Sequence, residues 1–368
     1  MARISGNKGE WSELYTLLYL LAHGRLNAAD CNLNVLPDVF FPILNIFREE
    51  TEGSTVQYHL SSEYENQVSE NCADKKVVIY LNEELLGCIP QSEIQSEVSY
   101  LYNSICSESG SFSLEKTEMF MEKMHCYKLK APTREKADIV LQIHDINTGY
   151  TPICGFSIKS DLGSPPTLLN AGKTTNFVYA VNGLTKESAE KINGIDTRQK
   201  IIDRMNSICA DGGTLVYSGM HNKTFRNNLV MLDSMLPQIM SAILLYSYTT
   251  GQKDCKDIVA KIEEQDPLQY GIKDIYAYKF KKFLCAIALG MMPATPWNGY
   301  DEANGGYIIV KKDGDVVAYH IYNRNSFEDY LLDNTCFERG STQKHDYAHI
   351  YENDGKMYIN LNAQIRFI

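Results

Sequence analysis

Asp138, Ser157 and Lys159 are the residues whose types and spacing most directly suggest a chemistry. Asp138 lies near the start of one apolar stretch, and Ser157 and Lys159 lie in a second, after a turn at Gly149. Side chains two positions apart on a β-strand share a face, so Ser157 and Lys159 point the same way. If the two stretches pair as antiparallel strands, Asp138 and Lys159 fall near the same end of the hairpin. We predict that this end is a candidate active site.

One carboxylate beside one lysine is the minimum equipment of a metal-dependent nuclease. The carboxylate binds Mg²⁺, which polarises the phosphoryl oxygen and lowers the pKa of bound water, while the lysine orients that water or neutralises developing charge. A further acid is expected to help, because one carboxylate alone is a sparse metal site. Glu10 and Glu13 in the segment 9–23 are candidates for this second ligand, and Asp161 is a third. The same spacing is also compatible with a structural salt bridge.

The elements that must position these residues indicate an α+β (mixed α/β) protein. Residues 9–23 carry apolar side chains at helical spacing and are followed by Gly24, which predicts a helix. Strands are expected near 56–60, 76–81 and 213–218, besides the two that carry Asp138 and Lys159. Further helices are expected at 91–104, 114–124, 254–264 and 273–290, and over most of 184–250.

The C-terminal part of the chain is predicted to be rich in antiparallel strands. Asp-Gly pairs at 313–314 and 354–355 favour the tight turns of β-hairpins. Apolar and polar residues then alternate over 357–367, as on a half-buried strand.

We therefore expect two parts. Residues 1–300 form a nuclease core, with the N-terminal helix, an acidic insertion at about 51–125 and a helical region. Residues 301–368 form a β-rich part that recognises DNA and packs on this core.

The net charge of −11 comes mostly from the first third of the chain. Residues 1–130 hold 19 acidic and 10 basic side chains of the 46 and 35 in the whole sequence, so the rest, with 27 and 25, is close to neutral. Attraction to phosphate depends on the local field more than on total charge, so this remainder is able to present a basic groove.

The composition favours a protein of the cytoplasm. The ten cysteines form no C-x-x-C pair and have no histidine at zinc-ligand spacing, so reduced thiols are expected. The N-terminus does not resemble a secretory signal. No apolar run matches the roughly 20 residues of a transmembrane helix, so no membrane association is expected.

Several sequence strings resemble a known family. Ala137-Asp138 stands where the PD-(D/E)XK nuclease superfamily has Pro-Asp, and Ser157-Ile158-Lys159 stands where it has acid-x-Lys. The surrounding strings are more specific, and together they resemble the HpaII family of type II restriction endonucleases. These strings are Gly6–Tyr15, Gly155–Ser160, Gly163–Asn170, Thr175–Phe177, Gly340–His345 and Asn362–Phe367.

The resemblance implies a PD-(D/E)XK-like nuclease core and a Mg²⁺-dependent enzyme that cuts double-stranded DNA at a short palindrome, with CCGG as the characteristic site. Asp138 would be the metal carboxylate and Lys159 the catalytic lysine. Ser157 departs from the superfamily acid, so Glu10, Glu13 and Asp161 all stay open as the second ligand. A palindromic target favours a homodimer. A cognate DNA methyltransferase is expected as a functional companion and not as a bound partner.

Two polar loops, 160–176 and 339–346, are candidates for reading such a target. Guanine is read by Arg or Lys, and the amino group of cytosine by an acceptor. The candidate DNA contacts are Ser160, Ser164, Asn170, Lys173, Asn176, Arg339, Ser341, Thr342, Gln343, Lys344 and His345.

Two alternatives remain at this stage. The first is a repair or recombination nuclease that selects DNA structure instead of sequence. The second is a sequence-specific DNA-binding protein that no longer cuts, which the serine at position 157 keeps open.

Overall fold

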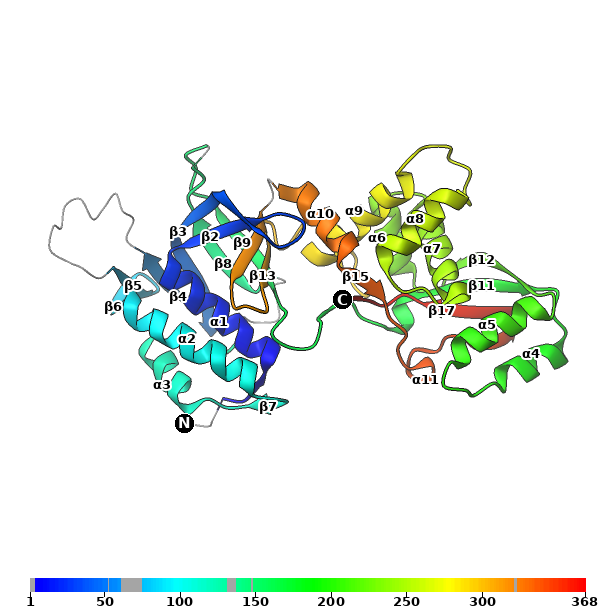
Figure 1. The fold of residues 1–368 in the computed structure, drawn as a ribbon, viewed down its shortest axis with the longest axis horizontal. Coiled ribbons are helices and arrows are strands. Elements are labelled where there is room, and N and C mark those ends of the chain that lie inside the picture. Colours follow the sequence, from blue (N-terminus) through cyan, green and yellow to red (C-terminus); the bar gives the residue numbers. More distant parts are fainter. Residues whose placement is uncertain (1–3, 52, 61–74, 131–136, 147, 321–322) are drawn as a thin grey trace. The chain divides into compact units, whose positions relative to one another are not determined.

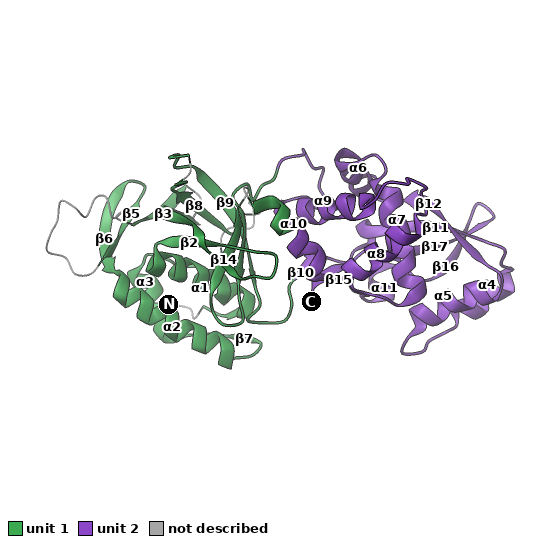
Figure 2. Ribbon diagram, turned by 45° about the horizontal axis from the view of Figure 1, so that its top comes forward, with its two compact units in different colours: residues 1–166, 301–327 green, residues 167–300, 328–368 purple. Residues whose placement is uncertain are grey.

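The computed structural model describes residues 4–51, 53–60, 75–130, 137–146, 148–320 and 323–368. Two compact units are coloured separately in Figure 2. Unit 1 consists of Met1–Pro166 and Asp301–Phe327, and unit 2 of Thr167–Tyr300 and Glu328–Ile368. Residues 61–74, in the predicted acidic insertion, lie outside the described part of the chain, and so does Cys72.

Unit 1 is organised around a mixed β-sheet (Figure 1). In the described residues this sheet has nine strands, in the order β2-β14-β13-β9-β8-β3-β4-β5-β6. β13 pairs parallel with β9, and β14 parallel with β2, while the other neighbours are antiparallel. Because β2 also pairs with β3, six of these strands close into a ring.

The strands of this sheet are β2 (Arg25–Ala29), β3 (Val35–Thr51), β4 (Ser54–Leu60), β5 (Lys76–Leu81), β6 (Glu84–Pro90), β8 (Ile139–Ile143), β9 (Ile153–Ser160), β13 (Gly306–Val310) and β14 (Val316–His320). The helices of unit 1 are α1 (Lys8–His23), α2 (Gln91–Ser107) and α3 (Glu115–Lys123), and a short pair of strands joins β1 (Gly6–Asn7) to β7 (Ser111–Phe112).

The helix α1 has defined ends. Asn7 Oδ1 accepts a hydrogen bond from the Glu10 N–H at 3.1 Å, and Glu10 Oε2 accepts one in return from the Asn7 N–H at 2.9 Å. This capping box satisfies two backbone donors that the first turn would otherwise leave unpaired. Gly24, at a φ of 66°, ends the helix, and its N–H donates to the Leu20 carbonyl. The predicted helix over 9–23 is confirmed.

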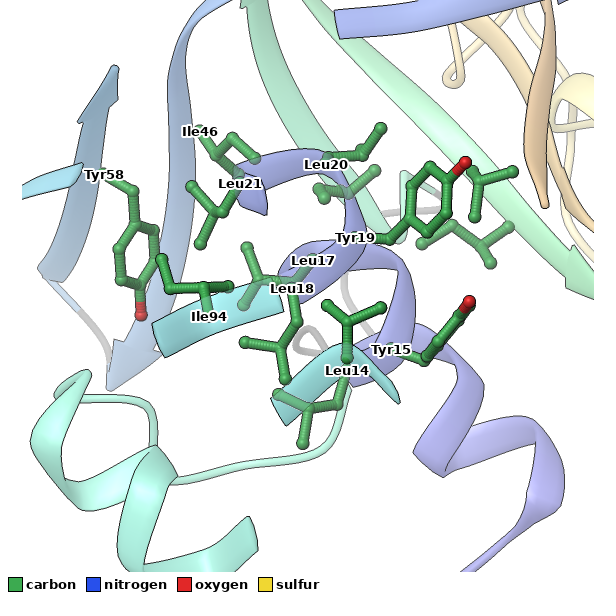
Figure 3. Close-up of a cluster of buried hydrophobic side chains, with 14 of the residues drawn as sticks. Leu14, Tyr15, Leu17, Leu18, Tyr19, Leu20, Leu21, Ile46, Tyr58 and Ile94 are labelled. Carbon is green, nitrogen blue, oxygen red and sulfur yellow. The ribbon is translucent and has the colours of Figure 1, made fainter. Parts of the chain in front are cut away.

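The helix α1 is buried on more of its circumference than a single apolar face. Figure 3 shows Leu14, Leu17, Leu18 and Leu21 among side chains from two strands and from α2. A helix buried on nearly all sides is fixed by its surroundings, and each buried leucine contributes roughly 1.5–3 kcal/mol. The first two turns of α1, which carry Glu10 and Glu13, are therefore held firmly in place.

The described residues of the acidic stretch belong to unit 1. They form β4, β5 and β6 at one end of the nine-stranded sheet, and then α2 and α3. The strands predicted near 56–60 and 76–81 and the helices at 91–104 and 114–124 are confirmed. The 17-residue strand β3 was not predicted.

Unit 2 combines helices with two smaller sheets (Figure 2). In the described residues, one sheet has four antiparallel strands in the order β12-β11-β17-β16, and the other has three in the order β10-β18-β15. The strands are β10 (Thr167–Leu169), β11 (Asn176–Asn182), β12 (Thr214–Met220), β15 (Thr335–Phe337), β16 (Ile350–Asn353), β17 (Lys356–Asn362) and β18 (Ile365–Phe367).

The helices of unit 2 cover most of 184–250 and the segments predicted to be helical at 254–264 and 273–290, and one more is short. They are α4 (Lys186–Asn193), α5 (Lys200–Ala210), α6 (Lys223–Leu232), α7 (Leu236–Thr250), α8 (Cys255–Gln265), α9 (Ile275–Leu289) and the short α11 (Thr342–His345). The helix α10 (Arg324–Asp333) crosses the division between the units at Phe327 and Glu328. The Tyr179 hydroxyl of β11 donates a hydrogen bond to the Ser241 carbonyl of α7 at 2.7 Å, which connects the four-stranded sheet to this helix.

The chain passes from unit 2 to unit 1 between Tyr300 and Asp301, at the predicted boundary near residue 300, but each unit is made of two segments. The hairpin expected from Asp313-Gly314 is β13–β14, but β13 is hydrogen-bonded to β9 and so belongs to the sheet of unit 1. Only 328–368 joins residues 167–300 in unit 2. Backbone pairing between strands distant in sequence decides this division, and local patterns do not report it.

Two local predictions also need correction, and one strand was missed. The alternating segment 357–367 is two strands and not one, because the Ala363 N–H leaves the ladder and donates to the Thr175 carbonyl at 3.0 Å. The segment 160–176 is not wholly a loop, since it contains β10 and a 3₁₀ turn at Lys173–Thr175. The strand β11 was not predicted.

Nine cysteines lie in the described part of the chain, and all nine are free thiols. Among the described helices, none by itself has the length and apolarity to cross a bilayer. The sharply bent pair α6 and α7 meets those two criteria only when taken together.

Candidate active site

The hairpin β8–β9 holds Asp138 in a fixed position. The predicted antiparallel pairing is confirmed, with Ile139 opposite Phe156. Asp138 Oδ2 accepts hydrogen bonds from the Ser157 hydroxyl at 3.1 Å and from the Ile158 N–H at 2.7 Å. Its own N–H donates to the Phe156 carbonyl. Within the described residues both bonds fall on one carboxylate oxygen, so Oδ1 is left for another partner.

Glu13 reaches this carboxylate from the first turns of α1. The pKa of Glu13 is raised to about 8, first because its carboxyl is buried and second because Asp138 carries negative charge nearby. The positive charges of Arg48, Lys159 and Lys130 oppose this shift. The two acids and Lys159 are therefore close enough to act on one another electrostatically, although they come from separate elements.

Glu13 and Lys159 also line one open pocket of about 750 Å³ in unit 1. The other lining residues are Asn7, Lys8, Gly9, Ser109, Gly110, Ile158, Ser160, Leu162, Gly163, Ser164 and Pro166. Two of the predicted DNA contacts, Ser160 and Ser164, are thus at the same pocket as the predicted catalytic lysine. Lys8 adds a second cation to its wall.

The other two candidate acids are placed differently. Glu10 is engaged by its cap and by an ion pair with Lys130, with Nζ at 3.0 Å from Oε1, and these bonds hold the pKa of Glu10 below its usual value. Asp161 follows Lys159 on the same strand face, yet it is not among the residues that line the pocket. Burial raises the pKa of Asp161, and Lys312 opposes the shift. Of the three candidates, Glu13 alone meets Lys159 at the pocket.

Sequence reasoning missed Arg48, a buried cation beside the site. Its side chain is 7% exposed, and its Nε donates to Glu50 Oε1 at 2.7 Å while a second nitrogen donates to the Lys128 carbonyl. Glu50 in turn accepts from the Tyr127 N–H at 2.8 Å. This network ties β3 to the segment that carries Lys130. The sequence signal was an Arg and a Glu two positions apart on one strand face, a spacing too common to single out.

The donor set suits a magnesium ion. Among the described residues there is no cluster of three or more His, Cys, Asp and Glu side chains arranged to hold a metal. Magnesium, however, is usually held by one or two carboxylates together with waters and substrate phosphates. Asp138 and Glu13 supply two carboxylates, and their mutual repulsion is the kind that a divalent cation relieves.

Among the predicted DNA contacts of unit 2, some are accessible and Asn176 is buried with a structural role. It is 2% exposed, and its amide donates to the carbonyls of His345 and Asp346 at 2.9 and 3.1 Å. The amide of Asn362, also 2% exposed, donates to Asn176 Oδ1 at 2.6 Å and to the Gly172 carbonyl at 2.7 Å. These asparagines join the two predicted recognition loops. A buried amide with these partners is not free to read a base.

Most other predicted contacts in unit 2 are accessible. Arg339 is half-buried, with one nitrogen donating to the Ser247 carbonyl at 2.7 Å and the guanidinium 5.2 Å from the Tyr248 ring centre. Lys173 forms an exposed ion pair with Asp346. Exposed side chains are found at Asn170, Ser341, Gln343 and Lys344, and half-buried ones at Thr342 and His345.

Glu13 and Lys159 at the wall of one pocket, with Asp138 close enough to act on Glu13 electrostatically, are the equipment of a metal-dependent nuclease, and comparison with known proteins identifies the family. The HpaII restriction endonuclease family model matches residues 7–367. The chain is 39% identical to the type II restriction enzyme HpaII of Haemophilus parainfluenzae over 369 aligned positions, which is 99% of each chain. No solved structure matches. This protein belongs to the HpaII restriction endonuclease family, whose members are type II site-specific deoxyribonucleases.

Proposed function

We propose that this protein cuts double-stranded DNA at a short palindrome, CCGG, in a Mg²⁺-dependent reaction. The observation that carries the proposal is the meeting of Glu13 with Asp138 and Lys159 in unit 1, since it supplies the acid that Ser157 does not. Membership of the HpaII restriction endonuclease family supports the target class. The PD-(D/E)XK-like identity of the unit 1 core belongs to the same proposal.

Each residue has a distinct part in this reaction. Asp138 and Glu13 would hold the magnesium ion, which when bound polarises the phosphodiester and makes water a stronger nucleophile. Ser157 and the Ile158 N–H orient Asp138 and do not themselves act on substrate. The Lys159 ammonium stabilises negative charge that develops on the phosphate or orients the attacking water. Ser160 and Ser164 offer hydroxyls to the DNA at the same pocket.

Sequencing the ends of digestion products tests this function directly. Purified protein with Mg²⁺ should cut plasmid DNA into discrete fragments whose ends all map to CCGG. Asp138→Ala and Lys159→Ala should lose cutting by about 10²–10³-fold or more, as expected when a group that stabilises transition-state charge is removed. Random degradation, or intact DNA at every Mg²⁺ concentration, would refute the proposal.

A palindromic target has two-fold symmetry, and a homodimer matches it. Mass measurement in solution with and without a CCGG duplex tests this part, since a protein that stays monomeric on DNA during cleavage contradicts it. The biological setting of the family is a restriction-modification system. A companion methyltransferase acting on the same site would protect host DNA without binding the nuclease.

A further inference from the structure

A second pocket, entirely within unit 2, gathers basic side chains. It has a volume of about 550 Å³, and Arg198, Lys200, Lys253 and Arg339 are all in its lining. No carboxylate is among the described residues that line it. Hydroxyl and amide groups complete the wall, and among them are Ser341, Thr342 and Gln343.

Three separate chain segments build this pocket. The first leads into α5, the second follows α7, and the third precedes α11. The Phe337 N–H donates to the Lys253 carbonyl at 2.7 Å, and Arg339 donates to the Ser247 carbonyl near the end of α7. A Cβ at Gly251 would lie only 3.1 Å from Ile202 of α5, so that segment packs closely on the helix. The basic groups are therefore brought together by the fold and not by sequence proximity.

Three of the four cations of this pocket lack, among the described residues, the acidic partners seen elsewhere in unit 2. On α9, Lys279, Lys281 and Lys282 each pair with a carboxylate, those of Asp233, Asp329 and Glu328. In the pocket Lys200 pairs with Asp196 at 2.8 Å. Within the described residues no carboxylate forms an ion pair with Arg198, Lys253 or Arg339. Three uncompensated cations around one hollow create a local positive field in a chain whose total charge is negative.

We propose that this pocket binds a backbone phosphate of double-stranded DNA. The proposal rests on the proposed function, and it adds a contact that positions DNA without reading its sequence. Phosphate oxygens accept hydrogen bonds from Arg, Lys, Ser, Thr and Gln side chains, which is the donor set present here. Arg198, Lys200 and Lys253 were not among the predicted DNA contacts. Arg339 has its guanidinium steadied by the Ser247 carbonyl and the Tyr248 ring.

The test compares two double variants that each remove two positive charges from unit 2. Arg198→Ala/Lys253→Ala alters the pocket, whereas Lys261→Ala/Lys273→Ala removes lysines that line neither pocket. Binding to a CCGG duplex and to a scrambled duplex is measured at several salt concentrations, with Ca²⁺ in place of Mg²⁺ to prevent cutting. Each lost phosphate contact should lower the slope of log affinity against log salt by about 1.

We expect the pocket variant to bind both duplexes more weakly, by a similar factor, with a slope smaller by about 1–2. If it matches the lysine control on both duplexes, the proposal is overturned while the proposed function stands. A loss confined to the CCGG duplex also overturns it, because phosphate contacts carry no sequence information. If the wild type neither binds nor cuts any duplex, the proposed function itself fails.

Free inorganic phosphate presents the same acceptor oxygens as a backbone phosphate of DNA, so a second experiment distinguishes these two ligands. The melting temperatures of the wild type and both double variants are measured with and without inorganic phosphate. Phosphate stabilisation that disappears only in the pocket variant, combined with unchanged DNA binding, would assign the pocket to a free anion and overturn the DNA assignment. Loss of affinity for both duplexes in that variant, with or without a phosphate effect on melting, supports it.

Discussion

In unit 1, Glu13 and Lys159 end at an open pocket, whereas in unit 2 the polar residues Asn176 and Asn362 are committed to holding two loops together. In the sequence, Glu13, Lys159 and Asn176 were all candidate site residues. They differ in their partners. The unit 1 groups act on one another through charge, whereas the unit 2 amide nitrogens donate to backbone carbonyls and, from Asn362, to Asn176 Oδ1.

This difference separates groups available to a ligand from groups that shape the site. A buried amide that donates to two or three carbonyls stabilises one arrangement of the chain. Burial and, second, the nearby charge of Asp138 raise the pKa of Glu13 to about 8, so its charged form is disfavoured, and such shifts are common at functional sites. Substitutions at Glu13 and Asn362 should therefore differ in kind, with the first affecting cleavage and the second affecting stability.

Replacing Glu13 should affect cleavage far more than replacing Glu10. Glu13→Gln removes one of the two proposed metal carboxylates, so the cleavage rate should fall about 10²–10³-fold. Glu10→Gln retains a side chain able to accept from the Asn7 N–H, so cutting should persist with a stability loss of about 0.5–1 kcal/mol. Single-turnover cleavage and urea unfolding measure the two effects. If Glu10→Gln lost more cleavage activity than Glu13→Gln, the result would assign the metal ligand to Glu10.

Acid should destabilise unit 1 through His320, which is 4% exposed at the end of β14. Burial lowers the pKa of His320 to about 4, with Asp145 opposing the shift. A lowered histidine pKa favours the neutral form in the folded state, so this stability is fully present above the unfolded pKa near 6.5 and is lost as pH falls from there through about 4. The total loss should be about 3 kcal/mol.

Tryptophan fluorescence measures this effect in unit 1 alone. Trp11 is fully buried in unit 1 and Trp297 lies in unit 2, so Trp297→Phe leaves a reporter of the first unit. Unfolding free energies of that protein, with and without His320→Gln, are compared between pH 7 and pH 4. The histidine version should lose more stability over this range. Parallel curves would mean that His320 is protonated in the folded state without cost.

Much of unit 1 was predictable because its patterns are local. The helix over 9–23 and the antiparallel β8–β9 hairpin follow from alternation, spacing and turn residues within short segments. What could not be read locally was which acid lies at the pocket with Lys159. Glu10 and Glu13 lie on one helix, and the structure shows that Glu10 is engaged by the capping box and Lys130 while Glu13 lines the pocket.

Unit 2 was less predictable because distant pairings define it. Asn176 begins β11, and its role depends on Asn362, which is 186 residues away along the chain. The basic pocket likewise joins three segments that have no shared motif. Residue type marks a group as polar, and only the tertiary structure shows whether its partner is internal. The β13–β14 hairpin was predicted correctly as a hairpin but not as a neighbour of β9.

Removing the Asn362 amide should loosen both recognition loops. Its nitrogen donates to Gly172, Thr175 and Asn176, so Asn362→Ala takes the described donor away from the buried Asn176 Oδ1 and should cost about 2 kcal/mol of unfolding free energy. Hydrogen exchange of the peptides containing 172–176 and 341–346 should rise together. The exposed Asn170 is the matched control, and Asn170→Ala should change stability by less than about 0.5 kcal/mol. Exchange that rises in only one loop would refute the coupling.

Ser157→Ala gives the smallest expected effect and the finest test of the contrast between positioning and reacting groups. The Ser157 hydroxyl and the Ile158 N–H both donate to Asp138 Oδ2, and the variant keeps the shorter backbone bond. We expect about a tenfold rise in the Mg²⁺ concentration needed for half-maximal cleavage, at the mild end for groups that orient a metal ligand. Ser157→Thr retains a hydroxyl and should restore most of the loss. An unchanged Mg²⁺ requirement in Ser157→Ala would mean that the Ile158 N–H alone fixes the carboxylate, and that the serine at this position is a packing residue of β9.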